Sequence, residues 1–232
     1  MKTLAIIPCY NEEGSIEKTI LSLKEKAPDI DYVIINDGSV DNTKQVCEEK
    51  GFNTIDLPFN LGLANAVQTG MLYAYKNNYE QAIQFDGDGQ HLPEYISDMQ
   101  KLMLDKRADI IIGSRYMKKY PFGLRGLGQL ILRFVIRIST GNTITDPTSG
   151  MRLVNRKMIE RFATEMNHGP EPDTLVYLIK HEGAVVLETP VTMQERKTGK
   201  SYFGGFTTVR YMAQMVVSIL LIQWFRAGVE NT

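Results

Sequence analysis

Short apolar runs alternate with longer segments of helical periodicity along the first half of the chain. Between the runs, segments such as Ser15–Lys26 carry apolar residues at roughly helical spacing. Strands that alternate with helices predict a mostly parallel, doubly wound α/β sheet. The runs that have the length of a strand are Thr3–Pro8, Tyr32–Ile35, Asn53–Leu57, Gln81–Phe85 and Ala108–Ile112.

The second half predicts further helices and the end of the sheet. Helices are expected over Gly123–Gly141, Met158–Phe162 and from Pro170 to His181, and two runs, Val185–Glu188 and Val191–Gln194, are expected to complete the sheet. We therefore expect one α/β domain over residues 1–205, followed by a C-terminal helical segment over residues 206–232.

The most apolar stretch of the chain is Val209–Phe225, which polar residues interrupt at every fourth position: Arg210, Gln214 and Ser218. A membrane-spanning helix needs about 20 mostly apolar residues, so this stretch is marginal as a span. A single polar stripe favours an amphipathic helix that lies in the membrane interface. The alternative is a helix that packs on its own domain or on a partner subunit.

Composition excludes several classes of protein. The chain has 232 residues, of which 43% are hydrophobic and 23% charged, as in an ordinary globular protein. A net charge of −1 provides no basic field to attract nucleic acid. Cys9 and Cys47 form no CxxC or Cys/His cluster, so a zinc site is not expected and a reducing compartment fits. The N-terminal run lacks the features of a signal peptide, so we expect a cytoplasmic protein.

Polar loops follow the predicted strands, and ligands of such sheets bind beyond the carboxyl ends of the strands. The loops are Tyr10–Glu13, Asn36–Ser39, Asp86–His91 and Gly113–Arg115. Because the strands are predicted to be parallel, we expect these loops to converge on one cleft.

The loop Asp86-Gly87-Asp88-Gly89-Gln90 offers three hard oxygen ligands around one point. Such ligands suit Mg²⁺ or Mn²⁺, which usually share their coordination shell with substrate phosphates. An isolated pair of aspartates with glycines is also typical of an ordinary turn. The convergence of the loops favours a site.

Six motifs in order resemble those of the family 2 inverting glycosyltransferases of the GT-A fold. The similarity is narrower to the dolichyl- or polyprenyl-phosphate sugar synthases, and it extends from residue 4 to about residue 203. The motifs are Pro8-Cys9-Tyr10-Asn11-Glu12, Asn36-Asp37-Gly38-Ser39-Val40-Asp41, Asn60-Leu61-Gly62, Asp86-Gly87-Asp88-Gly89-Gln90-His91, Gly113-Ser114-Arg115 and Asp146-Pro147-Thr148-Ser149-Gly150-Met151-Arg152.

The resemblance implies a metal-dependent hexosyltransferase on the cytoplasmic face of the membrane. It would move a hexose from a UDP- or GDP-linked sugar to a polyprenyl phosphate of the undecaprenyl or dolichyl type, for cell-envelope polysaccharide or glycan assembly. Mg²⁺ or Mn²⁺ would bridge the donor's diphosphate and stabilise the charge on the leaving nucleotide.

The same resemblance assigns residues to roles. Pro8, Tyr10, Glu12 and Asp37 match nucleoside contacts, and Asp86, Gly87 and Asp88 match contacts to the nucleotide sugar. Asp86, Asp88 and Gln90 match the metal triplet. Arg115, Arg125, Arg196 and Ser201 match phosphate contacts, because guanidinium groups bind phosphate oxygens bidentately. Asp88, Arg115 and Arg196 are the expected catalytic residues. Two positions depart from many relatives: Asn36 replaces an Asp, and Tyr202 replaces a Lys.

Several of these residues have a simpler interpretation. Tyr10 could be a core or rim aromatic, and His91 a histidine that supports the ligands without binding metal. The segment Gly123–Gly141 carries Arg133 and Arg137 on one helix face, which suits a membrane surface. A core helix whose arginines reach solvent is the alternative.

Three other functions compete with the transfer to a lipid phosphate. The first is a glycosyltransferase that acts on a sugar hydroxyl, with Glu171 or Asp173 as the base. The second is a phosphotransferase with Asp86 as the nucleophile. The third is a membrane-docked sugar-nucleotide sensor without enzymatic activity. The sequence leaves open the sugar, the nucleotide, the lipid length and whether the chain forms a homo-oligomer.

Overall fold

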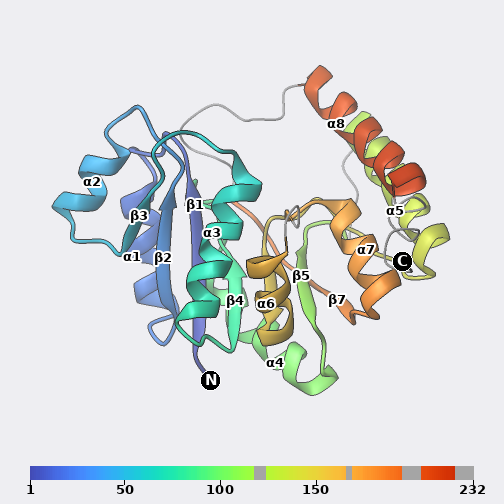
Figure 1. Cartoon of the computed structure of the whole chain (residues 1–232), viewed down its shortest axis with the longest axis horizontal. Helices are drawn as coiled ribbons and strands as arrows, with labels where there is room; N and C mark the ends of the chain where they lie inside the picture. The colour runs from blue at the N-terminus through green and yellow to red at the C-terminus, as the bar shows by residue number, and fades with distance from the viewer. Residues whose placement is uncertain (118–123, 166–168, 195–204, 223–232) are drawn as a thin grey trace.

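A seven-stranded sheet runs through the molecule in the order β3-β2-β1-β4-β6-β5-β7 (Figure 1). The structure is a computed structural model that describes residues 1–117, 124–165, 169–194 and 205–222. Strand β6 is antiparallel to β4 and β5, and the other pairings are parallel. The prediction of a mostly parallel, doubly wound sheet is confirmed. The strands are β1 (Thr3–Cys9), β2 (Asp31–Asn36), β3 (Thr54–Asp56), β4 (Gln81–Gln84), β5 (Ile110–Ser114), β6 (Arg152–Asn155) and β7 (Val186–Pro190).

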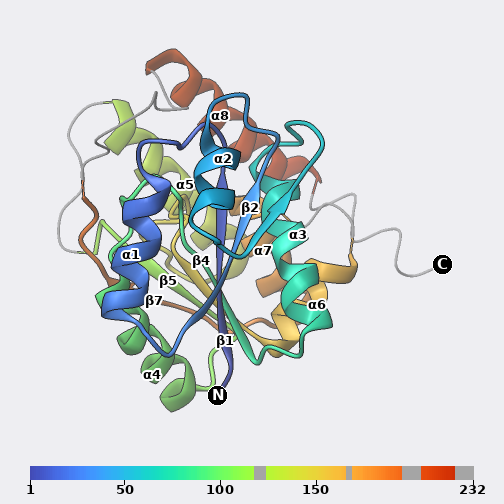
Figure 2. The ribbon, with the colours of Figure 1, turned by 90° about the vertical axis from the view of Figure 1, so that its left-hand side faces the viewer.

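Helices cover both faces of the sheet, and Figure 2 shows α1 and α3 on opposite sides of β1. One face carries α1 (Ile16–Lys26), α2 (Thr43–Glu49) and α4 (Ile96–Lys106), with the short helix η1 (Pro93–Tyr95) before α4. The other face carries α3 (Leu63–Lys76), α6 (Arg156–Thr164) and α7 (Pro172–Glu182). Leu4 and Ile6 of β1 belong to one hydrophobic cluster, whereas Ala5 and Ile7 belong to the other. This alternation follows from the twofold period of side chains along a strand.

Helices α5 (Leu124–Thr140) and α8 (Gly205–Val217) lie side by side at the end of the molecule far from β3 (Figure 1). The π-helical turn η2 (Ser218–Ile222) continues α8 and contacts α5 and α7. Met212 and Ile219 are buried, so this C-terminal helix packs on its own domain. Within the described ranges, no helix is long and apolar enough to cross a membrane.

Two details of the sheet differ from the sequence prediction. Strand β6 was not predicted, because it is short and opens with the charged Arg152. Arg152 pairs with Gln84 of β4 on one side and with Ile112 of β5 on the other. The neighbouring strands therefore bury β6, which its own sequence does not predict. Residues 191–194 form no strand, because this segment makes only isolated backbone bonds, from Val191 to Ser114 and from Gln194 to Gln90.

Candidate active site

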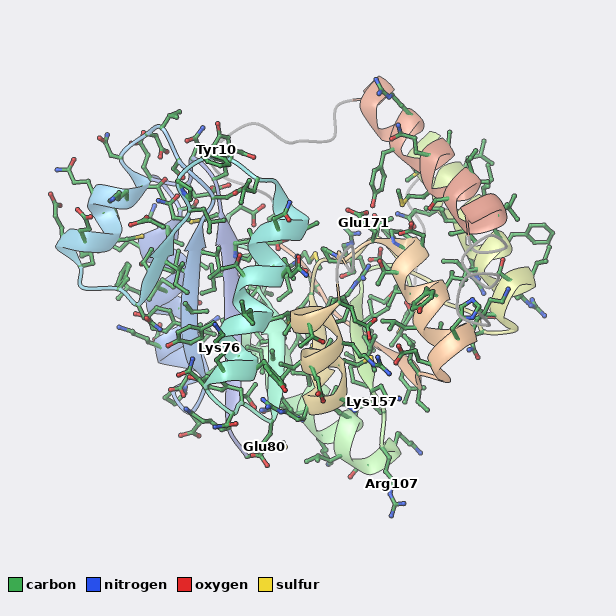
Figure 3. All side chains as sticks on the ribbon, in the orientation of Figure 1. Tyr10, Lys76, Glu80, Arg107, Lys157 and Glu171 are labelled. Carbon is green, nitrogen blue, oxygen red and sulfur yellow. The ribbon has the colours of Figure 1, made fainter. Side chains whose placement is uncertain are left out.

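The predicted site loops meet at one edge of the sheet, as the parallel strands require. Tyr10 follows β1, Asp37 follows β2, Asp86 follows β4 and Arg115 follows β5. In Figure 3, Tyr10 and Glu171 lie in the same upper part of the molecule, over its two halves. The loop after β1 and the start of α7 therefore lie at the same end of the molecule.

Asp86 is held in place by two neighbouring side chains. Gln84 donates its side-chain amide to Oδ1 of Asp86 at 3.1 Å. His91 accepts the backbone N–H of Asp86 at 2.9 Å, and its Nε2 lies 3.5 Å from Oδ2 of Asp86. His91 is buried and stacks edge-on against the Phe85 ring, with 5.5 Å between the centroids. Its contacts orient Asp86, which fits the interpretation of His91 as a supporting residue.

The loop that carries Asp88 and Gln90 is hydrogen-bonded to the segment that follows β7. Oδ1 of Asp88 accepts the backbone N–H of Gln90 at 3.0 Å. Gln90 and Gln194 exchange two bonds, one from the Gln194 N–H at 2.9 Å and one from the Gln90 amide at 3.3 Å. Asp88 and Gln194 also line a cavity of about 180 Å³ that extends toward Lys18 of α1. The predicted phosphate residues Arg196 and Ser201 follow in sequence and lie outside the described residues.

The chemistry of the donors at this edge fits a divalent cation. Asp86 and Asp88 carry carboxylates and Gln90 an amide oxygen, which are hard ligands. Across the described ranges, no three His, Cys, Asp or Glu side chains gather into a complete metal cage. A metal held here would therefore need further oxygen ligands, as Mg²⁺ commonly takes from substrate phosphates and water.

Arg115 forms a bidentate ion pair with the fully buried Asp146. Its Nε lies 2.7 Å from Oδ2, its Nη2 lies 2.9 Å from Oδ1, and its backbone N–H also donates to Oδ2 at 3.1 Å. Burial lowers the pKa of Arg115, but the hydrogen bond and charge of Asp146 outweigh it and raise the pKa overall. The guanidinium is thus a fixed positive charge at the end of β5.

The loop from Asp146 to Gly150 connects Arg115 with Asp86. A Cβ on Gly150 would lie 2.9 Å from Oδ2 of Asp86, so a larger residue here would displace the carboxylate of Asp86. Ser149 donates its hydroxyl to the Gly113 carbonyl at 2.6 Å and thereby anchors the loop to β5. The sequence identified this motif, but it did not assign Asp146 or Gly150 a role in the site. Both residues follow the long connection through α5, so the sequence does not show that they lie beside Arg115 and Asp86.

Asp37 and Glu12, which were predicted to contact the nucleoside, form hydrogen bonds within the loops that follow the strands. Both carboxylate oxygens of the buried Asp37 accept backbone N–H groups at 2.8 Å, from Leu61 and Gly62. The buried Glu12 accepts the Ser15 hydroxyl at 2.5 Å. These contacts fix the loops after β1, β2 and β3 around the edge, and base recognition by Asp37 stays a prediction.

Three other predicted positions surround these loops. Pro8 is buried within β1, and Tyr10 is half-buried at the rim. Asn36 donates to Oδ1 of Asp56 at 2.7 Å and accepts the Ser39 N–H at 3.2 Å. An aspartate in place of Asn36 would set two carboxylates against each other, which explains the amide here.

Hydroxyl groups from the C-terminal helix cover the two acids that begin α7. Tyr211 of α8 donates to Glu171, and Ser218 of η2 donates to Oδ2 of Asp173 at 2.6 Å. Burial, together with the charge and hydrogen bond of Glu171, raises the pKa of Tyr211. The phenol is therefore a stable donor to the carboxylate. Arg125 belongs to the first turn of α5, and its side chain lies outside the described residues.

Comparison with known proteins places this arrangement among enzymes. The family model described as Glycosyl transferase family 2 matches residues 4–162. A polyprenol monophosphomannose synthase of Mycolicibacterium smegmatis is 27% identical over 218 residues, which cover 88% of this chain and 82% of the relative. A UDP-N-acetylglucosamine–dolichyl-phosphate N-acetylglucosaminyltransferase of Methanococcus voltae is 29% identical over 228 residues, covering 87% and 90%.

A solved structure extends the similarity to the fold. The glucosyl-3-phosphoglycerate synthase of Mycobacterium tuberculosis, in complex with Mn²⁺, uridine diphosphate and phosphoglyceric acid, matches with a TM-score of 0.69. The match covers 96% of this chain and 78% of that chain at 13% sequence identity. The two chains therefore share the architecture of the sheet and of the helices that cover it.

Proposed function

Because the chain belongs to glycosyl transferase family 2 and is a glycosyltransferase of the GT-A fold, we propose that it transfers a hexose from a nucleoside diphosphate sugar to a polyprenyl phosphate. The reaction takes place at the cytoplasmic face of the membrane. The relatives from Mycolicibacterium smegmatis and Methanococcus voltae carry names that specify sugar transfer to a prenyl phosphate, which supports this acceptor class.

The observation that carries the lipid acceptor is an exposed apolar face on α5, which we call the α5 stripe. Its residues are Leu127, Leu130, Ile131, Phe134 and Ile138. Phe134 and Ile138 are 63% and 67% exposed, whereas Leu132 and Ile136 on the inner face are fully buried. Contiguous exposed apolar side chains mark membrane or protein contacts. Helix α5 thus combines the core role and the surface role that the sequence left as alternatives.

The flanks of the α5 stripe suit an anionic membrane surface. Arg137 on α5 and Arg210 on α8 are exposed, and Val217 and Leu220 extend the apolar surface along α8 and η2. A helix with an apolar face and flanking cations binds the headgroup region of such a surface. We therefore assign the α5 stripe to the bilayer and the site loops at the edge of the sheet to the phosphate head of the lipid.

Within the site, Asp86, Asp88 and Gln90 would hold a divalent metal ion, either Mg²⁺ or Mn²⁺. Bound there, the metal supplies charge stabilisation to the diphosphate of the donor. The Mn²⁺ and uridine diphosphate of the solved relative with the same fold support a metal in this class of site. Pro8, Tyr10, Glu12 and Asp37 lie around the nucleoside, and Gly87 lets the backbone pass close to the nucleotide sugar.

The transfer is a single displacement with inversion at the sugar. An oxygen of the lipid phosphate forms a bond to C1 of the hexose, while the bond from C1 to the donor's diphosphate breaks. The leaving nucleoside diphosphate takes the electron pair. Arg115 stabilises that charge, and we propose the same for Arg125, Arg196 and Ser201. Asp146 holds the Arg115 guanidinium in place before the reaction, which reduces reorganisation in the transition state.

A phosphate acceptor is anionic at neutral pH and needs no general base. A sugar hydroxyl would need a carboxylate to accept its proton. Glu171 and Asp173 are the carboxylates at the start of α7, and both accept hydrogen bonds from hydroxyl groups of the C-terminal helix. A carboxylate has further lone pairs, so these bonds alone do not choose between the acceptors, and the names of the relatives favour the phosphate.

The test is donor turnover with the purified protein, a divalent metal and candidate nucleotide sugars, measured with and without polyprenyl phosphate in vesicles. We expect rapid release of nucleoside diphosphate only when the lipid phosphate is present. Turnover that responds to a soluble hydroxyl acceptor and not to the lipid would contradict the proposal. Binding of the donor without any turnover would indicate a sensor.

A further inference from the structure

Gln129 is a polar residue at a core position of α5, and the proposed reaction does not use it. It lies on the inner face of the helix with Leu132 and Ile136, which follow it at the i+3 and i+7 positions and are fully buried. This spacing predicts an apolar residue at position 129 as well. Gln129 is nevertheless only 1% exposed. A residue that breaks the pattern of its own element is expected where function decides its identity.

The side-chain amide of Gln129 is only half satisfied. Its Nε2 donates to Oγ1 of Thr148 at 2.6 Å, whereas its Oε1 is buried and has no hydrogen-bond partner among the described residues. A buried acceptor without a partner costs free energy, and an apolar side chain of similar shape would avoid this cost. The stability of α5 therefore does not explain the glutamine, and its bond to Thr148 is the contact that can.

Thr148 carries this contact to Arg115. Its hydroxyl accepts a bond from Nη2 of Arg115 at 3.3 Å and donates to Oδ1 of Asp146 at 3.3 Å. The same Nη2 donates to Oδ1 of Asp146 at 2.9 Å, so the three groups contact one another. With one bond donated and two accepted, the hydroxyl uses its complete hydrogen-bonding capacity. Gln129 therefore fixes the hydroxyl group that contacts the guanidinium.

Other groups hold the backbone of the same loop. Glu188 of β7 accepts the Asp146 N–H at 2.9 Å. Arg152 of β6 donates to the Pro147 carbonyl at 2.6 Å and to the Ser149 carbonyl at 2.9 Å. Loss of the glutamine amide would leave these bonds in place. Its effect should therefore be confined to the threonine side chain and to the guanidinium that this side chain contacts.

We propose that Gln129 is a positioning residue, which holds the Thr148 hydroxyl against Arg115 and so fixes the guanidinium that stabilises the leaving nucleoside diphosphate. The effect on the reaction rests on the proposed function, whereas the effect on the Arg115 side chain does not. Gln129 lies on the helix whose outer face carries the α5 stripe. The hydrogen bond thus joins the helix that we assign to the membrane to the loop that holds Arg115.

The test replaces the amide with an apolar side chain of similar length, Gln129→Met. Solvent exchange of the Arg115 Nε–H is followed by heteronuclear NMR, with Arg115→Lys to identify the signal, together with kcat, the donor KM and the melting temperature. Loss of one hydrogen bond predicts about fivefold faster exchange and about fivefold lower kcat, with a smaller change in the donor KM. The melting temperature should equal or exceed that of the wild type.

Gln100→Met on α4 is the matched control. Gln100 donates to Thr3 at 2.8 Å and to Gln81 at 3.3 Å, at the amino ends of β1 and β4 and therefore at the edge of the sheet opposite the site loops. Both partners are buried, so this glutamine has a structural role. The control should show the opposite pattern, with a lower melting temperature and the kcat of the wild type.

A second pair of variants tests the hydroxyl group itself. Thr148→Val keeps the shape and removes the hydroxyl, so its kcat should be at least as low as that of Gln129→Met. Thr148→Ser keeps the hydroxyl and should retain a kcat several-fold above that of Thr148→Val. Because both residues act through one contact, adding Gln129→Met to Thr148→Val should lower kcat no further.

Unchanged Nε–H exchange in Gln129→Met, or an unchanged kcat in an enzyme that transfers sugar, would overturn the proposal. A melting temperature well below that of the wild type would assign Gln129 to stability and overturn it as well. A wild type that transfers no sugar to lipid phosphate would contradict the proposed function alone, because the Nε–H exchange still decides whether Gln129 fixes Arg115.

Discussion

At the scale of single residues, the proposed site consists of pairs in which one partner is assigned to the reaction and the other fixes its position. Asp146 orients Arg115, and Gln84, His91 and Gly150 surround Asp86. The supporting residues are buried or lack a side chain, so their effect on the reaction acts through geometry. Two substitutions separate these kinds of role.

Asp88→Ala removes a proposed metal ligand and should abolish transfer while the fold survives. Loss of a ligand costs several kcal/mol of transition-state stabilisation, which corresponds to a rate at least about 100-fold lower. Initial rates and thermal melting of the purified variant provide the measurement, with Asp105→Ala on α4 as the control. A variant with near-normal rates would show that Asp88 does not bind the metal.

Asp146→Asn leaves Arg115 without its charged partner, and both activity and stability should fall. We expect a loss of about 3 kcal/mol of unfolding free energy, the low end for a broken buried ion pair, because Arg115 keeps some contact with solvent. Denaturant unfolding measures this loss. Lys26→Ala, which breaks the exposed ion pair with Glu94, should cost less than about 1 kcal/mol. Equal costs for the two variants would contradict the structural role of Asp146.

The residues that could be predicted are those that directly follow strands. Asp86, Asp88 and Arg115 each stand at a strand's carboxyl end, so a local pattern located them. Asp146 and Arg152 could not be found in this way, because their partners are distant in sequence or are backbone carbonyl groups. Asp37 shows the same limit, since its bonds to Leu61 and Gly62 depend on how two loops meet.

At the scale of elements, the two faces of helix α5 have different roles. One face is part of the core, while the α5 stripe is exposed and apolar. The sequence predicted a helix over Gly123–Gly141, and α5 occupies 17 residues of this range. The sequence did not show which apolar residues of α5 are exposed, because exposure depends on how α7 and α8 pack against this helix.

Phe134→Glu should weaken binding to anionic vesicles without lowering the melting temperature. Burying a Phe side chain contributes about 1.5–3 kcal/mol, so its loss corresponds to an affinity at least about tenfold lower. Vesicle sedimentation gives the affinity. Leu104→Glu on α4 is the control, since Leu104 is 57% exposed and lies outside the α5 stripe. The same loss in both variants would remove the special role of the stripe.

The strands show which elements a pattern can predict. Strands β1, β2 and β4 are apolar runs between clear turns, and they form where predicted. Strand β6 forms because it can pair with β4 on one side and β5 on the other. Residues 191–194 form no strand, although apolar and polar residues alternate in their sequence. Local alternation predicts a strand only where a partner strand is available.

At the scale of the whole molecule, the described part of the C-terminal helix packs on the α/β domain. Met212 and Ile219 belong to the main hydrophobic cluster, and Tyr211 bonds to Glu171. Removal of this helix would therefore open the core as well as alter the surface that we assign to the membrane. The single-residue variants above separate these effects, which a truncation would mix.

The most direct test of the central claim is the chemical identity of the product. The protein is incubated with a nucleotide sugar and polyprenyl phosphate in vesicles, and the lipids are analysed by mass spectrometry and by NMR of the anomeric proton. The account predicts a hexose joined through C1 to the lipid phosphate, with the anomeric configuration of the donor inverted. A sugar joined to a hydroxyl group, or a retained configuration, would contradict it.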